Sequence, residues 1–273
     1  MEYLDQSVQV SAQDIESYQR NGHVRLNKLC DSAHIASFQN EVKQAVGARK
    51  ESISAIPMEQ RDTYGKAFLQ IMNLWVDNPS LAKWILSKRF ASVAAQLMGV
   101  ERVRIYHDQA LFKEPRGGIT PWHQDQHYWP LETDNCITMW MPLMDITAAM
   151  GTLNFASGTS QVGYLGDMPI SDDSERYLSE MCQARGFDIV NYGDMNAGDA
   201  TFHSGWCLHG APGNHTDTLR EVMTIIWYED KTRIIDRPDP QGRWNKSREN
   251  DLATWLPGCK PGGLAASKLN PLI

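Results

Sequence analysis

The stretch Pro121-Trp-His-Gln-Asp-Gln-His-Tyr-Trp129 carries the pattern from which the fold and the site can be predicted. In an extended segment, side chains two residues apart point the same way, so His123 and Asp125 are expected to leave one face together as an imidazole and a carboxylate. Such a pair supplies two of the three ligands of a common metal site. Because the motif alone also fits a structural hydrogen-bonded pair at a strand end, a metal site requires a third ligand elsewhere in the chain.

Three histidines compete for the third ligand position: His203, His209 and His215. If a hairpin tip lies between Asn214 and His215, residues 209 and 220 are equidistant from it, and His209 faces Arg220 as a cross-strand pair. A guanidinium beside a metal-bound histidine suits a dicarboxylate that chelates the metal at its 2-oxo acid end and pairs with the arginine at the other. His209 is therefore the predicted ligand. Two histidines and a carboxylate with open positions are typical of mononuclear non-haem Fe(II) oxygenases.

Composition places the chain among ordinary globular proteins. Of 273 residues, 42% are hydrophobic and 22% are charged, so a sizeable core is expected. No apolar run is long enough to span a bilayer and the first residues lack a signal-peptide pattern, so we expect a cytoplasmic protein with no membrane partner. The net charge of −7 argues against nucleic acid as a partner. A small-molecule substrate is the remaining expectation, and the oligomeric state is not predicted.

The first part of the chain, residues 1–99, is predicted to be a mostly helical flank. Ser11 is an N-cap signal, and Gly22 is a signal for the end of the helix that follows it. The elements expected in this flank are a helix over 11–22, a strand over 23–29, a helix from 31, a surface loop over 48–64 and a helix over 78–99.

After Gly99 the spacing of apolar residues changes from a helical period towards two. Short alternating runs between Gly, Pro and Asn turns predict strands packed as a sandwich or barrel over residues 100–232. Residues 167–186 are charged and partly helical in pattern, and are expected on one rim. The tail, residues 233–273, has little periodicity and is expected to pack along the body. Since no linker is visible, residues 1–273 are predicted to form one domain.

Several motifs spread over the chain occur together. They are His123 to Trp129, Met139-Trp140 followed by Gly151-Thr-Leu153, Gly198-Asp199 followed by Phe202-His203, His209-Gly210, and Arg220 eleven residues after His209. In combination they resemble the phytanoyl-CoA hydroxylase (phytanoyl-CoA dioxygenase) family of Fe(II)- and 2-oxoglutarate-dependent dioxygenases. The N-terminal helix and Asn21-Gly-His-Val24 also resemble this family, so the resemblance covers nearly the whole chain.

The resemblance implies a fold and a set of site residues. The implied fold is mainly β with flanking α-helices, built on a double-stranded β-helix (jelly-roll, cupin-like) core. The implied catalytic centre is iron held by His123, Asp125 and His209, with 2-oxoglutarate contacted by Arg220, Gln109 and Trp140.

The sequence departs from the family pattern at Ala211, where members usually have Ser or Thr to help hold the far carboxylate. One missing hydrogen bond weakens binding by about 1 kcal/mol, unless Thr138 or Thr218 replaces it. A related halogenating group has Ala or Gly in the place of Asp125, so the carboxylate argues for an oxygenase outcome.

Other aromatic and histidine side chains near the motif are candidates for a substrate pocket. His127, Trp129 and Trp206 are predicted to contact substrate, although core packing is the alternative for each of them. His107 lies on the strand before the motif, where a core histidine with its hydrogen bonds satisfied is expected.

The expected activity is hydroxylation of an unactivated C–H bond in a small organic molecule of secondary metabolism. O2 and 2-oxoglutarate are the expected cosubstrates, and succinate and CO2 the released products. Desaturation, ring closure or epimerisation would use the same centre. The alternative is a cupin-like metal-dependent isomerase or hydrolase without O2 chemistry, since zinc accepts the same ligands; Arg220 argues against it. A third hypothesis, a binding module without turnover, is supported only by Ala211.

Overall fold

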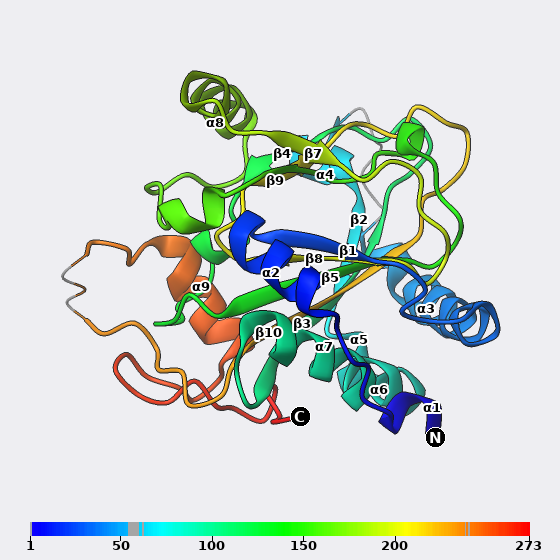
Figure 1. Ribbon diagram of the computed structural model, residues 1–273, viewed down its shortest axis with the longest axis horizontal. Helices are drawn as coiled ribbons and strands as arrows, with labels where there is room; N and C mark the ends of the chain where they lie inside the picture. Colours follow the sequence, from blue (N-terminus) through cyan, green and yellow to red (C-terminus); the bar gives the residue numbers. More distant parts are fainter. Residues whose placement is uncertain (1, 54–59, 62, 238, 240) are drawn as a thin grey trace.

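The computed structural model describes residues 2–53, 60–61, 63–237, 239 and 241–273, and its centre consists of two antiparallel sheets (Figure 1). The larger sheet has the strand order β1-β8-β5-β10-β3-β2, and the smaller has β4-β9-β6-β7. The larger sheet contains β1 (His23–Leu26), β2 (Leu69–Met72), β3 (Val103–Phe112), β5 (Cys136–Pro142), β8 (Ala200–Ser204) and β10 (Val222–Glu229). The smaller contains β4 (Thr120–His123), β6 (Asn154–Ala156), β7 (Ile189–Asn191) and β9 (His209–Ala211). The predicted β-rich fold with helices is confirmed.

Most helices lie on one side of the larger sheet, whereas α8 lies beyond the smaller sheet and α9 lies beside the end of the two sheets (Figure 1). They are α1 (Glu2–Asp5), α2 (Ala12–Asn21), α3 (Ser32–Ile53), α4 (Thr63–Ala67), α5 (Leu74–Asp77), α6 (Pro79–Ile85), α7 (Lys88–Met98), α8 (Asp172–Arg185) and α9 (Lys246–Trp255). The predicted cap of α2 is confirmed, because the Ser11 side chain accepts a hydrogen bond from the N–H of Asp14 and Gly22 is left-handed. None of the described helices is long and apolar enough to cross a membrane.

Several elements differ from the sequence prediction. The single helix expected over 78–99 is two helices, because the backbone of Ser87 is extended and starts α7 anew. Helix α3 continues to Ile53, into the predicted loop 48–64, of which residues 54–59 and 62 lie outside the described residues. The strand predicted over 23–29 is present as β1, and the mostly helical flank also supplies β2, so that both edge strands of the larger sheet come from it. The tail, which has little periodicity in the sequence, contains α9, a helix that was not predicted.

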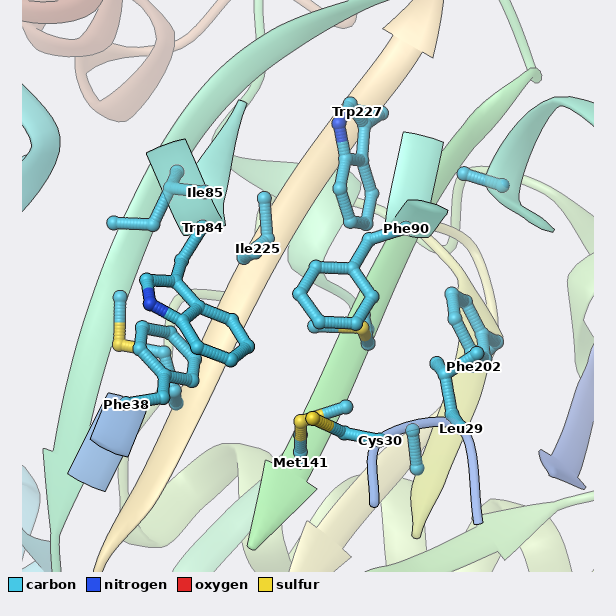
Figure 2. Close-up of a cluster of buried hydrophobic side chains, with 14 of the residues drawn as sticks. Leu29, Cys30, Phe38, Trp84, Ile85, Phe90, Met141, Phe202, Ile225 and Trp227 are labelled. Carbon is cyan, nitrogen blue, oxygen red and sulfur yellow. The ribbon is translucent and has the colours of Figure 1, made fainter. Parts of the chain in front are cut away.

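The larger sheet separates a hydrophobic core from a cavity. Alternation along β5 produces this division, because Ile137 and Met139 face the helices whereas Thr138 and Trp140 line the cavity. Figure 2 shows the helix-side core, which includes Phe38 of α3, Trp84 of α6, Phe90 of α7, Phe202 of β8 and Ile225 and Trp227 of β10. One face of the sheet is thereby fixed by apolar packing and the other is left for polar side chains.

A β-bulge in β3 changes which of its side chains face the cavity. The pairing with β10 passes from Ile105 directly to His107, so Tyr106 has no partner in that ladder. Ile105 belongs to the helix-side core, and after the bulge Asp108 is on that side while His107 lines the cavity. The extra residue therefore places the His107 side chain in the cavity and the Asp108 carboxylate against the helices.

Asp108 provides a test of this arrangement. Its fully buried carboxylate accepts hydrogen bonds from the N–H groups of Leu74 (2.9 Å) and Trp75 (3.3 Å), in the first turn of α5. We expect Asp108→Ala to lower the free energy of unfolding by about 2–4 kcal/mol, because two buried N–H groups lose their acceptor. Urea unfolding measures the change. Glu16→Ala, in an exposed pair with Arg20, is the control and should cost less than about 0.5 kcal/mol; an equally small effect for Asp108→Ala would contradict the capping role.

Candidate metal and cosubstrate site

Three side chains from separate parts of the chain converge on one point. His123 ends β4, Asp125 begins the 3-10 turn η2 (Asp125–His127), and His209 begins β9. One potential ligand atom from each lies within 4.8 Å of the other two. The Nε2 atoms of His123 and His209 lie 3.4 and 3.7 Å from Oδ1 of Asp125. The structure therefore brings the three predicted residues together in a cluster that can hold one metal ion.

Strand register brings the two histidines together. His123 is the direct partner of His209 between β4 and β9, and their ring centroids are 4.2 Å apart. The predicted extended conformation at Asp125 is wrong, because this residue starts a 3-10 turn in which the N–H of Gln126 donates to the carbonyl of Gly205. A Cβ on Gly205 would lie 2.8 Å from the Trp129 ring and 3.0 Å from Cβ of Gln126, so the close approach favours glycine.

Arg220 does not face His209 across a hairpin, as the sequence predicted. Its backbone pairs with Lys113 at the end of β3, whereas His209 pairs with His123 and Phe155 of the smaller sheet. The segment between His209 and Arg220 crosses from one sheet to the other, so these two residues reach the site from opposite sides. Both line one cavity of about 500 Å³.

Backbone carbonyls fix the orientation of both histidine rings. Nδ1 of His123 lies 2.7 Å from the carbonyl oxygen of Pro121, and Nδ1 of His209 lies 3.0 Å from that of Cys207. Since a carbonyl only accepts, each Nδ1 must carry the proton, and each Nε2 keeps a free lone pair beside Asp125. Burial, followed by the neighbouring His123 and His203 rings, holds the pKa of His209 well below its usual value, which keeps the ring neutral. Both rings are therefore ready to bind a metal.

The Asp125 carboxylate is held by groups other than the two histidines. The Thr138 hydroxyl lies 2.9 Å and Nε2 of His203 lies 3.3 Å from its Oδ2. His203, a competing candidate for the third ligand in the sequence, lies beside the cluster, with its ring centroid 4.2 Å from that of His209.

The other end of the cavity contains the buried guanidinium of Arg220, and the buried Lys113 is its backbone partner. Arg220 donates to the carbonyl of Gly151, its Nε has no partner among the described residues, and its guanidinium lies 5.2 Å from the Trp140 ring. Nζ of Lys113 donates to backbone and hydroxyl oxygens, the nearest being the carbonyl of Gly118 at 2.7 Å. Burial lowers the pKa of Arg220 to about 9 and that of Lys113 to about 6. No described carboxylate forms an ion pair with either group, so this end of the cavity is suited to an anion.

The remaining predicted site residues divide into two sets. Gln109, Trp140 and Trp129 line the cavity, and the side-chain oxygen of Gln109 accepts a hydrogen bond from the glutamine of β2. His127 and Trp206 do not line it. His127 is buried, with its Nε2 3.5 Å from Oδ1 of Asp167, and the indole N–H of Trp206 donates a hydrogen bond to Asp134. Of the three substrate-pocket candidates, only Trp129 therefore keeps a place in the cavity.

Sequence reasoning did not place His107, His203, Asp251 or Trp255 in the cavity that they help to line. His107 and His203 lie on strands and face the cavity. Which residues lie next to them across the sheet could not be predicted without the strand register. Asp251 and Trp255 come from α9, whose polar sequence gives little helical pattern beyond the Asn245 cap. That cap, with a side-chain oxygen accepting from the third residue of the helix, was the available signal.

A two-histidine, one-carboxylate cluster between two antiparallel sheets, beside a guanidinium without a described counter-ion, defines a class: the mononuclear non-haem iron enzymes. Residues 18–222 match the sequence model of phytanoyl-CoA dioxygenase (PhyH). The match spans most of the chain, so the protein belongs to the phytanoyl-CoA dioxygenase family. The predicted family and the predicted class, an Fe(II)- and 2-oxoglutarate-dependent dioxygenase, are confirmed.

Individual relatives are distant. A probable alpha-ketoglutarate-dependent hypophosphite dioxygenase of Stutzerimonas stutzeri is 20% identical over 231 residues, covering 80% of this chain and 78% of that protein. An ectoine dioxygenase of Bordetella parapertussis is 25% identical, covering 59% of this chain and 53% of that protein. Among solved structures, the carbocyclase SnoK from nogalamycin biosynthesis has a TM-score of 0.75 at 20% identity, covering 97% of this chain and 96% of that one. The epimerase SnoN, in complex with Fe3+, alpha ketoglutarate and nogalamycin RO, has a TM-score of 0.70 at 20% identity, covering 95% and 97%.

The Thr138 hydroxyl gives a prediction for the metal site. Thr138→Val keeps the shape of the side chain but removes the hydrogen bond to Asp125, and loss of such a supporting contact weakens metal affinity by about 10-fold or more. Calorimetric titration with Mn(II) measures the dissociation constant. Thr201→Val is the matched control, because that hydroxyl is buried without a partner among the described residues. Equal affinities for the two variants would show that Thr138 does not support the ligand.

Proposed function

We propose that His123, Asp125 and His209 hold Fe(II) and that Arg220 binds the far carboxylate of 2-oxoglutarate. The observation that carries this proposal is the burial of Arg220, without a described counter-ion, in the same cavity as the three candidate ligands. A dianion that chelates the metal at its 2-oxo acid end would supply the missing negative charge. Its length would span the distance from one sheet to the other.

The donor set supports iron. Two imidazole Nε2 lone pairs and one carboxylate on one side of a metal leave the other positions open, which suits non-haem Fe(II). Zinc or manganese would accept the same three residues, but a hydrolase or isomerase has no use for a buried guanidinium at the far end of its cavity. The O2-independent alternative therefore leaves Arg220 without a role.

Gln109 and Trp140 are proposed to contact the same cosubstrate. When bound, the iron supplies activation of O2, coupled to conversion of 2-oxoglutarate to succinate and CO2 and to hydroxylation of a C–H bond. The chain would bind and orient the reactants. The planar guanidinium of Arg220 would hold the far carboxylate of 2-oxoglutarate, and Gln109 and Trp140 line the same cavity. The apolar side chains of Leu111 and Leu153 line the same wall and exclude water.

We also infer that the two sheets form a double-stranded β-helix core over residues 100–232, with residues 1–99 as a flank that adds two strands and residues 233–273 as a tail packed on it. The whole chain, 1–273, would then be one catalytic domain in the cytoplasm. SnoK and SnoN come from nogalamycin biosynthesis, which supports a small organic substrate of secondary metabolism. Ring closure and epimerisation, the outcomes named for those two proteins, are the alternatives to hydroxylation.

The proposed ligand set can be tested by metal binding. His209→Ala removes one of three ligands, so we expect Mn(II) affinity to fall by more than about 100-fold, beyond the loss caused by a supporting contact. Calorimetric titration of the metal-free protein measures it. His215→Ala, an exposed histidine in the loop after β9, is the control and should bind as the wild type does. Metal bound equally well by His209→Ala would overturn the assignment.

The proposed cosubstrate contact can be tested with Arg220→Lys. Lysine keeps the charge but cannot make the two-pronged contact with a carboxylate, which is worth about 1.5–3 kcal/mol, so the dissociation constant of 2-oxoglutarate should rise by about 10- to 100-fold. The measurement is titration of the Mn(II)-loaded protein with 2-oxoglutarate. Metal affinity should remain unchanged, because Arg220 lies outside the ligand cluster. A wild-type dissociation constant for the variant would contradict the proposal.

The reverse substitution at Ala211 completes this test. Ala211 lines the cavity near the Arg220 end, and neither predicted replacement is available, since Thr138 is bonded to Asp125 and Thr218 does not line the cavity. Ala211→Ser should therefore lower the dissociation constant of 2-oxoglutarate by about fivefold, the effect of one hydrogen bond of about 1 kcal/mol.

A further inference from the structure

Helix α9 forms the wall of the cavity at the end away from Arg220. Asp251, Thr254 and Trp255 of this helix line the cavity, together with His107 of β3. Figure 1 shows α9 beside the end of the two sheets, on the side opposite α3. A helix from the C-terminal tail thus contributes one carboxylate and one indole to a site whose metal ligands come from the sheets.

Strand β3 measures the separation between the two ends. His107, Gln109 and Leu111 follow one another on its cavity face, and Lys113 pairs with Arg220 at its end. The backbone of Arg220 therefore lies six residues of strand, about 20 Å, from His107, and its side chain reaches back to within 5.2 Å of the Trp140 ring. The α9 end carries a carboxylate with no described ion-pair partner, so it does not suit the dianion and is left for a different molecule.

The Asp251 carboxylate has unused hydrogen-bonding capacity. Its described hydrogen-bond partner is the Tyr106 hydroxyl, at 2.8 Å, and no described Lys, Arg or His forms an ion pair with it. A carboxylate accepts about four hydrogen bonds. Burial raises the pKa of Asp251 to about 7, because the charged carboxylate is held away from water without a described cation beside it. Its free lone pairs are consequently available to a donor in the cavity.

The bulge in β3 explains why polar groups gather here. Tyr106 has no strand partner, and both it and His107 approach α9: Tyr106 through its hydroxyl, and His107 through its ring, whose centroid is 5.1 Å from that of Trp255. The predicted core histidine with satisfied hydrogen bonds is wrong for His107, because its buried Nδ1 has no partner among the described residues. An acceptor, an unsatisfied imidazole and an indole face thus share one end of the cavity.

We infer that Asp251 orients the primary substrate, and that this substrate presents a hydrogen-bond donor, a hydroxyl or an ammonium, to the Asp251 carboxylate beside the Trp255 ring. The inference rests on the proposed function, in which the Arg220 end is taken by 2-oxoglutarate. An indole face adds attraction for an ammonium and apolar contact for a ring. An anionic group is repelled at this end, so selection by charge is opposite at the two ends of the cavity.

Three matched probes test the inference: cyclohexylamine, cyclohexanol and cyclohexanecarboxylate. Each is titrated into the full-length protein loaded with Mn(II) and 2-oxoglutarate, and binding is followed by the broadening of probe proton resonances that a nearby paramagnetic ion causes. We expect the amine, the alcohol or both to bind at least tenfold more tightly than the carboxylate. Preference for the amine alone identifies an ammonium, and equal preference for both donors identifies a hydroxyl.

The variant Asp251→Asn should abolish the tenfold preference, whereas Glu249→Gln, on the exposed face of the same helix, should preserve it. Both variants should keep the wild-type dissociation constant for 2-oxoglutarate, which shows that they are folded and that the proposed function holds independently. A carboxylate probe that binds as tightly as the amine and alcohol, no broadening of any probe, or a preference unchanged in Asp251→Asn would each overturn the inference. Failure of 2-oxoglutarate to bind the wild type would instead overturn the proposed function.

Discussion

The register between β4 and β9 is the constraint on which the rest of the site depends. It sets His123 directly opposite His209, and a shift of one residue would turn one of the two rings out of the cavity. Carbonyl acceptors then fix the proton on each Nδ1, and the turn after β4 brings Asp125 to the two free Nε2 atoms. The geometry is thus determined by backbone pairing, with side-chain contacts from Thr138 and His203 holding the carboxylate in place.

Charge is distributed unevenly along the cavity, and this polarity connects the structure to the chemistry. Arg220 lies buried at one end without a described carboxylate, which is costly unless an anion binds there. Asp251 lies at the other end without a described cation. The metal-ligand candidates line the same cavity. Such an arrangement lets a cosubstrate and a substrate bind in one cavity without competing for the same groups.

The sequence was sufficient where local chemistry decides the structure. Ser11 and Gly22 delimit α2 through capping, and the period-two pattern identifies the strands. It was insufficient where long-range pairing decides: symmetry about residues 214 and 215 predicted a hairpin, but the chain crosses between sheets there. His203 was overlooked for the same reason, since its neighbour Asp125 depends on the turn η2. Helix α9 was missed because it is stabilised by docking on the sheets and carries few apolar residues.

The most direct test of the account is spectroscopic. Chelation of Fe(II) by a 2-oxo acid produces a visible charge-transfer band, which requires the metal and the cosubstrate to be bound at one site. Fe(II) and 2-oxoglutarate should be added to the metal-free protein in the absence of O2, and the absorption spectrum recorded. The account predicts the band for the wild type and its absence for Asp125→Ala. No band with the wild type, or an undiminished band with that variant, would contradict it.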